Sequence, residues 1–466
     1  MTRRTAVVAG GGLAGLAAAC QLAESAVPVL LLEKRPFLGG RAYSHQDKSI
    51  GVEVDNGQHV FLGCCTEYIA FLKRLGAWEQ AHLQKRMRVP VIDKVWGASM
   101  LQSAPLPPPL HLLPSLLGFK SLSPAEKLGA IYAFAQIRSV KREKSTQLDD
   151  LTFEDWLQKR RQTPNAIRSL WNLIVQPTLN DEMSRVSADL ALMVFQEGFL
   201  SSRDGANVGW ARVGLTSLLG EAARRYIEER GGEVRTGVPV TGIELEDGRV
   251  SRVLMDGEAL TADAFVLAVP PPAVLPLLPA PVASDPFFAR IASIQVSPIV
   301  NVHMWYDRPV WQGKFAAFLN TPVQWAFNKT RLWGLEGPGQ YIDISLSGAH
   351  EFIQMSNAEI VEMFRKEMES PRRKAARRDL LAAAGGAAIA AGPGDAGGES
   401  LPGRRLDRHR LAGDDGERCA QRSDGGRQHA GRNNGTGREG GSGVRLNSRR
   451  CLRRRPPVAI LHRSYL

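Results

Sequence analysis

The sequence predicts an α/β fold, in which a Rossmann-like nucleotide-binding domain is interleaved with an α+β second domain and followed by a disordered basic tail. Three observations lead to this prediction. A strand, a glycine turn and a helix open the chain; helix and strand patterns that complete such a domain return from residue 215; and hydrophobic periodicity is lost beyond residue 370. With 466 residues, 44% of them apolar, the chain can bury a core large enough for two domains.

The net charge of +12 belongs to the tail. Residues 371–466 hold 21 Lys and Arg against 9 Asp and Glu, whereas residues 1–370 hold 38 of each. Because the body is neutral and has no nucleic-acid recognition module, we expect no nucleic-acid partner. The weaker, non-enzymatic hypothesis is a protein that binds nucleic acid or anionic lipid through its basic tail.

The five cysteines lack metal-ligand spacing, and the chain shows neither a signal peptide nor a long apolar run. We therefore expect a cytoplasmic protein, with peripheral contact to the inner membrane left open.

The first element is a dinucleotide fingerprint. A buried strand at residues 6–9 leads into Gly10, Gly12 and Gly15, and helical spacing follows from residue 13 to residue 24. Gly10 allows the tight turn, Gly12 lets the backbone approach a pyrophosphate, and Gly15 lets the helix pack closely on the strand. The positive end of the helix would then hold the diphosphate.

The second strand, residues 29–32, ends in Glu33. A carboxylate at this place accepts hydrogen bonds from ribose hydroxyls and disfavours the 2′-phosphate of NADP. The following stretch "FLGGRAYS" contributes Gly39, Gly40 and Arg41. This element resembles the one that follows the fingerprint in amine oxidases and phytoene desaturases, and the resemblance implies FAD as the cofactor.

A second nucleotide-binding segment is expected after residue 205. Residues 215–229 have amphipathic helical spacing, and several short strands follow up to the prolines at 270–272. In the resembling flavoproteins a valine and an isoleucine at this place reach the adenine, and Val240 with Ile243 matches them. The predicted boundaries are 1–85 and 205–275 for the FAD-binding domain, 86–204 and 276–368 for the substrate domain, and 369–466 for the tail.

The substrate half contains the apolar, proline-rich stretch "LPPPLHLLPSLLGF", then helical patterns at residues 124–140 and 152–161. This stretch could form the lip of a channel for an apolar substrate or a covering layer over the sheet, and the sequence leaves both readings open.

Three further segments resemble the hydroxysqualene dehydroxylase family, also called squalene-associated FAD-dependent desaturases. They are "VEVDNGQHVFLGCCTEYIAFLKRLG" at 52–76, "WNLIVQPTLND" at 171–181 and "TPVQWAFNKT" at 321–330. The resemblance implies that the hydroxyl of hydroxysqualene, a hydrophobic isoprenoid, is replaced by hydride from reduced FAD to give squalene in hopanoid biosynthesis. A carotenoid-type desaturase and a flavin amine oxidase are the alternatives.

The chemistry needs an acid that assists loss of the hydroxyl. His59 is the predicted catalytic residue, because it lies in the loop expected near the flavin ring, although a structural hydrogen-bonding role is also open. Gly57 of the same loop belongs to the predicted cofactor-binding residues. Asp55 and Tyr43 are weaker candidates for the acid. Cys64 and Cys65 are expected to be core thiols rather than nucleophiles.

The tail raises a question about the third cofactor element, an Ala-Gly-Asp turn followed by a helix. "LAGDD" at 411–415 has neither a preceding apolar strand nor a following amphipathic helix. Codons shifted by one base permit the turn and the helix over residues 403–422, and the preceding strand over residues 398–402. We therefore expect a frame slip between roughly residues 365 and 389, loss of this FAD motif in the chain as written, and no packing of residues 371–466 against the body.

Overall fold

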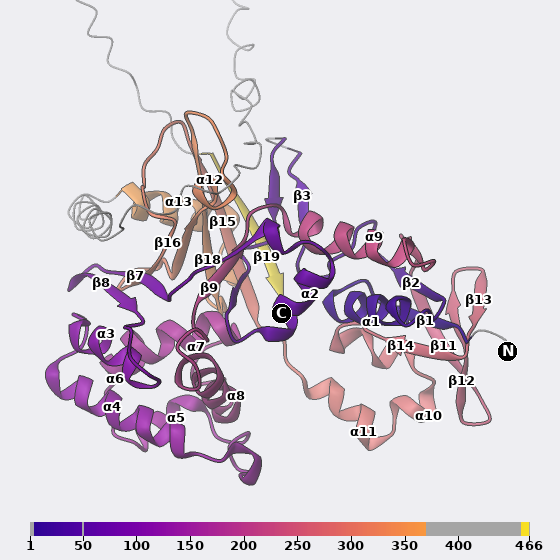
Figure 1. Ribbon diagram of the computed structural model, residues 1–466, viewed down its shortest axis with the longest axis horizontal. Coiled ribbons are helices and arrows are strands. Elements are labelled where there is room, and N and C mark those ends of the chain that lie inside the picture. The colour runs from indigo at the N-terminus through magenta and orange to yellow at the C-terminus, as the bar shows by residue number, and fades with distance from the viewer. Residues whose placement is uncertain (1–3, 49–50, 370–457, 466) are drawn as a thin grey trace, which may run out of the picture. The chain divides into compact units, whose positions relative to one another are not determined.

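Four parallel strands form the sheet that carries the glycine fingerprint (Figure 1). The computed structural model describes residues 4–48, 51–369 and 458–465. The strand order is β10-β2-β1-β14, with bounds Glu233–Thr236, Val29–Glu33, Ala6–Ala9 and Ala264–Leu267. Two of these strands precede residue 85 and two follow residue 205, so the sheet is assembled from segments far apart in the sequence.

The two faces of this sheet have different covers. On one face, Val8 and Leu31 pack with α1 (Leu13–Glu24), the π-helix η6 (Thr216–Glu221) and α9 (Ala222–Glu228). On the other face, Val7 and Leu32 pack against an antiparallel sheet of β11 (Val240–Glu246), β12 (Arg249–Met255) and β13 (Glu258–Thr261). Because neighbouring residues of a strand point to opposite faces, short apolar runs suffice to build both contacts.

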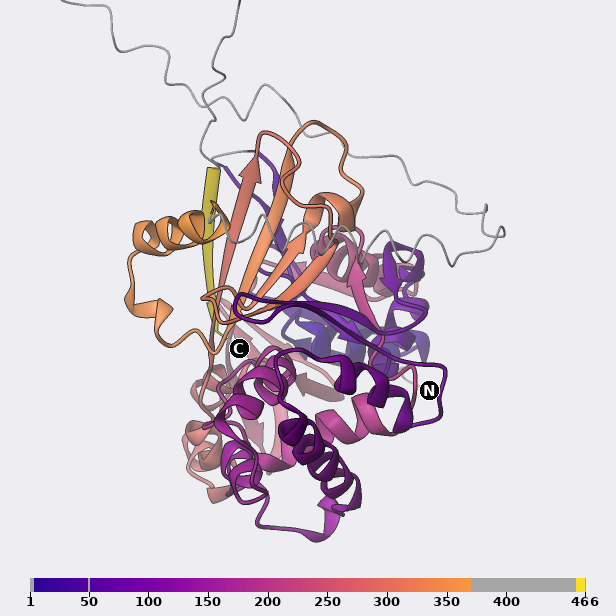
Figure 2. The same cartoon turned by 90° about the vertical axis from the view of Figure 1, so that its left-hand side faces the viewer.

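A larger sheet of seven strands forms the second half of the fold (Figure 2). Its order is β19-β15-β18-β17-β16-β7-β8. The bounds are Val458–Tyr465, Pro298–Tyr306, Gln340–Ser347, Trp325–Asn328, Phe315–Leu319, Arg88–Asp93 and Gly97–Gln102. Its core on one face is made by alternate residues of β15 and β18, such as Val302 and Ile344, together with Phe364 of α13 (Asn357–Glu369).

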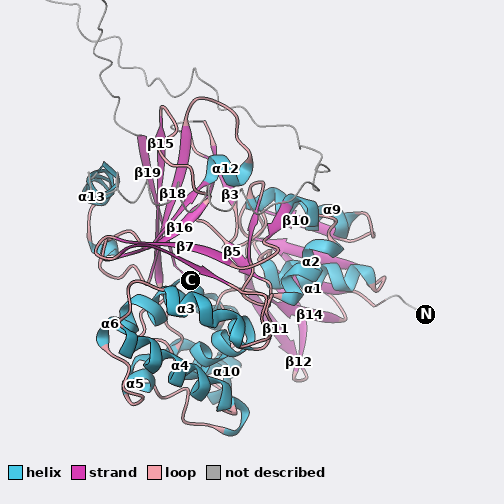
Figure 3. Ribbon diagram, turned by 60° about the vertical axis from the view of Figure 1, so that its left-hand side comes forward, coloured by secondary structure: helices cyan, strands magenta, loops and turns pink. Residues whose placement is uncertain are grey.

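The opposite face of the large sheet meets a layer of helices (Figure 3). This layer contains α3 (Leu113–Gly118), α4 (Pro124–Ser139), α5 (Phe153–Gln158), α6 (Pro164–Ala166), α7 (Asn172–Leu179) and α8 (Ala188–Met193). Buried aromatic rings join the two layers, because Trp171 and Phe195 belong to the same apolar cluster as Phe315 of β16. The helix that the sequence predicts at 124–140 forms almost as expected, and Ser123 with Glu126 gives it a capping box.

Smaller elements link the two halves. The hairpin of β3 (Ser44–Gln46) and β4 (Glu53–Asp55) follows the second strand, and a further sheet joins β5 (Val60–Leu62), β9 (Val208–Ala211) and β6 (Ala81–Leu83). Helix α2 (Thr66–Arg74) follows β5, whereas α12 (Lys329–Trp333) follows β17. The short helices α10 (Ala280–Ala283) and α11 (Pro286–Ala289) lie between β14 and β15.

The end of the chain corrects one prediction. Residues 458–465 form β19, which pairs antiparallel with β15 along its full length, so the expectation that nothing in 371–466 packs against the body is wrong for this segment. The reason is local: "VAIL" is a short apolar run within a polar tail, and the outer strand of a sheet offers unpaired backbone groups to it. Residues 370–457 and 466 of the predicted tail, which include 411–415, lie outside the described residues.

The packing of β19 can be measured. Leu461 is half-buried against the core that β15 and β18 share with α13, so Leu461→Ala should lower the free energy of unfolding by about 1 to 2 kcal/mol. The matched control is Leu245→Ala, because Leu245 of β11 is 39% exposed and should tolerate truncation. Equal effects of the two changes in urea unfolding would contradict this packing.

Candidate functional site

The glycine turn has the geometry of a pyrophosphate cradle. Gly12 is the N-cap of α1 and no side chain caps this helix end. A Cβ on Gly10 would lie 2.3 Å from the Ala268 carbonyl oxygen, and one on Gly15 would lie 1.8 Å from the Gly10 oxygen, so both positions require glycine. A Cβ on Gly12 would meet only the Gly40 Cα, at 3.8 Å. The helix end is therefore uncapped and open, as an anion site requires.

The acid and the second glycine pair lie beside this turn. The buried Glu33 carboxylate accepts a hydrogen bond from the Gly11 amide at 2.6 Å. The Gly39 amide donates to the Gly11 carbonyl at 2.9 Å, and Gly40 at φ +60° packs so closely on Gly12 that a Cβ there would lie 2.7 Å from the Gly12 Cα. These predicted residues are thus brought together, and the cradle fits the diphosphate and ribose of a dinucleotide.

The remaining predicted cofactor residues lie in two places. Val240 belongs to the segment beside Glu33, because the Val238 amide donates to the Glu33 carbonyl at 3.0 Å. Arg41 and Gly57 line a cavity next to the cradle instead. The position of Gly57 depends on close packing, since a Cβ there would lie 2.5 Å from the Asn301 side-chain nitrogen. Contacts of these residues with FAD stay a prediction.

The cavity has a volume of about 610 Å³ and is mostly apolar. Its apolar lining comes from the large sheet, the helical layer and the proline-rich stretch, including Leu112, Leu116, Phe134, Leu170, Leu173, Ile174, Met193, Phe199, Ile299, Trp325 and Phe327. Polar lining residues include the loop Asn56–His59 together with Asn301, Ser345 and Ser347. Arg41 and Glu197 are the charged side chains among the lining residues.

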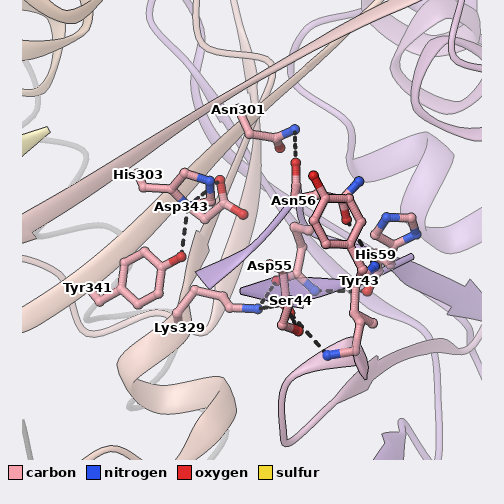
Figure 4. Close-up of polar contacts among 12 residues, drawn as sticks. Tyr43, Ser44, Asp55, Asn56, His59, Asn301, His303, Lys329, Tyr341 and Asp343 are labelled. Atoms are coloured by element: carbon pink, nitrogen blue, oxygen red, sulfur yellow. Dashed lines mark hydrogen bonds and ion pairs between the residues drawn. The ribbon is translucent and has the colours of Figure 1, made fainter. Parts of the chain in front are cut away.

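A buried ion pair lies behind the 56–59 loop (Figure 4). The Lys329 ammonium donates to Asp55 Oδ2 at 2.6 Å and to Gln58 Oε1 at 3.0 Å, and both charged side chains are at most 1% exposed. Asp55 Oδ1 also accepts from the Ser44 hydroxyl at 2.6 Å and from the Leu215 amide at 3.1 Å. Asp55 is therefore held as a fully bonded carboxylate, which suits an anchor of the loop better than an acid.

A second buried group adjoins this pair on the large sheet. His303 of β15 lies opposite Asp343 of β18, and its Nδ1 lies 2.7 Å from the Tyr341 hydroxyl. The Asp343 carboxylate is fully buried and has no hydrogen-bond partner among the described residues. Burial raises the pKa of Asp343 to about 7, while the charge of Lys329 opposes the shift. Asp343 can therefore hold a proton near neutral pH.

His59 and Tyr43, the other predicted acids, differ in placement. His59 lines the cavity, and its pKa is lowered by burial and by the charges of Lys329 and Arg41, against the opposing charge of Asp55. Its imidazole is consequently neutral at neutral pH. The Tyr43 ring stacks on Phe37 with centroids 4.6 Å apart and is absent from the cavity lining.

Sequence reasoning missed Lys329, Asn301 and Asp343. A signal for two of them is present in the strands: "PIVNVHMWY" has Asn301 and His303 two positions apart, and "QYIDISLS" has polar residues at 343, 345 and 347, all within otherwise apolar runs. That period marks a sheet face that is polar although it is buried. Lys329 carries no such signal, because its role comes from a partner in another segment.

The comparisons with known proteins agree with this geometry. A sequence profile of the family described as flavin containing amine oxidoreductase matches residues 13–374. The chain is 27% identical over 383 residues to a 15-cis-phytoene desaturase of Solanum lycopersicum, covering 78% of this chain and 63% of that one. It is 23% identical over 403 residues to a zeta-carotene desaturase of Zea mays, covering 78% of this chain and 70% of that one. The chain thus spans somewhat less than two thirds of the tomato relative.

Solved structures share the fold at lower identity. An oxidoreductase from Methanosarcina mazei superposes with a TM-score of 0.62 at 18% identity, covering 79% of this chain and 85% of that one. Putrescine oxidase bound to putrescine superposes with a TM-score of 0.58 at 19% identity, covering 78% of this chain and 80% of that one. The predicted α/β fold is confirmed, and the family confirms the flavin cofactor, predicted as FAD.

The raised pKa of Asp343 predicts a pH-dependent stability. A carboxyl whose folded pKa of about 7 exceeds its ordinary value of 3.8 stabilises the fold at low pH, and this contribution is lost as the pH rises from about 4 through about 7. The loss is on the order of 4 kcal/mol, because each unit of pKa corresponds to about 1.4 kcal/mol. Asp343→Asn should remove this slope from unfolding free energies measured between pH 4 and pH 8.

Asp93→Asn is the matched control. Asp93 is also buried, but hydrogen bonds from Asn320 and Ser121 outweigh the effect of its burial and lower its pKa. Its replacement should shift stability by a constant amount between pH 5 and pH 8. An Asp343→Asn protein that keeps the wild-type slope would show that Asp343 ionises normally in the folded state.

Proposed function

We propose a reaction for this chain from the premise that it belongs to the flavin-containing amine oxidoreductase family, whose profile covers residues 13–374. It is an FAD-dependent oxidoreductase of the amine oxidase and carotenoid desaturase type. Within that type we assign it to the reductive dehydroxylation of hydroxysqualene to squalene. The observation that carries the proposal is the apolar cavity of about 610 Å³ whose lining includes the polar 56–59 loop.

The lining favours a hydrocarbon over an amine. The cavity wall is built from leucine, isoleucine, phenylalanine and methionine side chains, which gain from burying an isoprenoid chain. An ammonium substrate would lose its hydration in this cavity, and Glu197 is the one carboxylate among the lining residues that could compensate for the loss. The polar lining around Asn56–His59 and Asn301 gives a hydroxyl on the chain hydrogen-bonding partners.

The reaction breaks a C–O bond and forms a C–H bond, and it consumes one hydride and one proton with release of water. Reduced FAD supplies the hydride when it is bound. The protein must orient the hydroxyl, exclude water and provide the proton. His59, as a neutral imidazole, can donate a ring N–H to the hydroxyl. Asp343 can hold a proton close by: it lies two residues before Ser345 on β18, on the same face of the sheet, and Ser345 lines the cavity.

A carotenoid-type desaturase is the second candidate, because phytoene and zeta-carotene desaturases are among the relatives. Desaturation moves a hydride from substrate to flavin and a proton from the neighbouring carbon to a base, and it needs no hydroxyl on the substrate. The neutral His59 could accept this proton, but the polar groups of Asn301 and the 56–59 loop in the cavity lining would have no partner on a pure hydrocarbon. The polar residues in the cavity lining therefore favour the dehydroxylase.

We place the cavity opening at a membrane surface. Leu112 and Leu116 line the cavity, while Leu110 and Leu117 of the same proline-rich stretch are 51% and 53% exposed. This segment thus offers apolar side chains both to a substrate and to a lipid surface. No helix within residues 4–48, 51–369 and 458–465 is long and apolar enough to cross a membrane.

The third cofactor element bears on whether this chain is active. The sequence positions at which we expect the Ala-Gly-Asp turn lie outside the described residues. With the adenine half of the cradle intact, the chain as written should recognise the nucleotide but lack a contact to the ribityl chain. One charge-assisted hydrogen bond contributes about 1.5 to 3 kcal/mol, so its loss lowers FAD affinity by one to two decades.

The direct test is anaerobic incubation of hydroxysqualene with chemically reduced FAD and the protein, followed by analysis of the products. We expect squalene from the frame-restored chain, and little or none from the chain as written. Ile174→Trp should reduce product formation about tenfold or more, because the larger ring fills the cavity.

Leu128→Trp serves as the control, since Leu128 is 68% exposed on α4 and does not line the cavity. Phytoene, with oxidised FAD, tests the desaturase alternative, and putrescine tests the amine oxidase. New double bonds in phytoene, or oxidised amine, without any squalene from hydroxysqualene would overturn the proposal.

A further inference from the structure

One face of the large sheet places two polar side chains side by side in the cavity wall. Asn301 of β15 and Ser345 of β18 lie directly opposite each other in the antiparallel register, and both line the cavity. Residues paired in this way point to the same face of a sheet, with their Cβ atoms about 4.5 to 5.5 Å apart. A single polar group that enters the cavity can therefore contact both side chains.

The Asn301 amide has a fixed orientation. Its nitrogen donates to the Asn56 carbonyl at 3.4 Å (Figure 4), and this bond distinguishes the nitrogen from the oxygen. The amide also packs on Gly57, where a Cβ would lie 2.5 Å from the nitrogen and 3.1 Å from the oxygen. Asn301 is 1% exposed, and its oxygen has no hydrogen-bond partner among the described residues. Because a buried acceptor without a partner costs free energy, this position favours a donor that arrives with a ligand.

The polar neighbours of this pair are already bonded within the protein. Ser347, two residues further along β18, donates its hydroxyl to the Asn180 side chain at 3.0 Å. The side-chain amides of Asn56 and Gln58 each accept one hydrogen bond and donate another. The Ser345 hydroxyl, in contrast, forms no hydrogen bond with any residue that the structure describes. The unused hydrogen-bonding capacity of this sheet face thus lies at one pair of positions.

Other polar lining residues differ from this pair because water reaches them. Arg41, Glu197 and Cys65 are exposed, and Cys64 is half-buried. The prediction that Cys64 and Cys65 are core thiols is therefore wrong, because the apolar run at 60–62 ends before them. A group that water already solvates gains little from a ligand hydroxyl, whereas a buried group without a partner gains a hydrogen bond.

We propose that Asn301 and Ser345 recognise the hydroxyl of the substrate and make the cavity selective for an isoprenoid alcohol over the hydrocarbon of the same skeleton. The substrate hydroxyl donates to the Asn301 oxygen and accepts from the Ser345 hydroxyl. Trp325 of β17 pairs with Ser345 from the neighbouring strand and also lines the cavity, so it supplies the adjoining apolar surface. The inference rests on the proposed function, since it names the residues that select the proposed substrate.

The test measures binding, with the full chain and two ligands that differ by one hydroxyl. Tritium-labelled hydroxysqualene and squalene are each equilibrated with the protein at the same detergent concentration. Wild type should bind hydroxysqualene about tenfold more tightly than squalene, or better, because the hydrocarbon leaves two polar groups of the wall without a partner. Asn301→Leu and Ser345→Ala should each reduce this ratio to about threefold or less, without weakening squalene binding.

Ser169→Ala is the matched control. Ser169 is buried, its hydroxyl donates to the Asn165 side chain, and it does not line the cavity. This variant should keep the wild-type ratio. Circular dichroism verifies the fold of each variant, and Ser345→Ala removes a single oxygen atom, so it carries the test even where Asn301→Leu fails to fold.

Equal affinities of wild type for the two ligands would overturn the inference, as would an unchanged ratio in either folded variant. FAD binding by the same proteins distinguishes a second source of the donor, the ring N–H of a flavin. A lower FAD affinity of Asn301→Leu with an unchanged hydroxyl preference would assign the amide oxygen to the cofactor and overturn the inference.

The binding assay needs neither flavin nor turnover, so this inference and the proposed function fail separately. Squalene formation from hydroxysqualene without a binding preference would refute the role of Asn301 and Ser345 alone. A binding preference without squalene formation by the frame-restored chain would support that role and refute the proposed reaction.

Discussion

The buried ion pair of Asp55 and Lys329 is the contact on which the arrangement of the site depends. Neither side chain is more than 1% exposed, and removing two charges from water is costly unless every lone pair and proton finds a partner. Here the Asp55 carboxylate also accepts hydrogen bonds from the Ser44 hydroxyl and the Leu215 amide. The Lys329 ammonium also donates to the Gln58 side chain and lies 3.9 Å from the centre of the Trp333 ring. Four segments of the chain therefore meet at one charge pair, and the 56–59 loop, which directly follows Asp55, is fixed between the nucleotide cradle and the cavity.

The large sheet explains why polar and apolar regions adjoin so closely. On one face β15 and β18 bury apolar residues against α13, and on the other face the same strands present Ile299 and Ser347, then Asn301 and Ser345, then His303 and Asp343 in register. This second face passes from the cavity wall into the buried polar cluster within a few residues. One strand pair thus supplies both polar groups of the cavity wall and a buried carboxyl that can hold a proton.

The sequence predicts the cradle well because its signals are local. The strand, glycine turn and helix at residues 6–24 and the acid at 33 lie within one βαβ unit, where spacing alone determines contact. The buried network was out of reach, since Lys329 and Asp55 are 274 residues apart and their pairing follows from tertiary packing. At the end of the chain the prediction relied on average composition, which is polar, and therefore overlooked the short apolar run that forms β19.

A double-mutant cycle of Asp55→Asn and Lys329→Met tests most directly whether this pair organises the site. Urea unfolding at pH 7 would give the free energies of unfolding of wild type, both single variants and the double variant. Each single change leaves one buried charge without its partner, so each should cost about 3 to 5 kcal/mol, and the double variant should recover enough for a coupling energy of about 2 to 4 kcal/mol. Effects that add to within about 0.5 kcal/mol would contradict the account, because they would mean that the two side chains stabilise the fold independently.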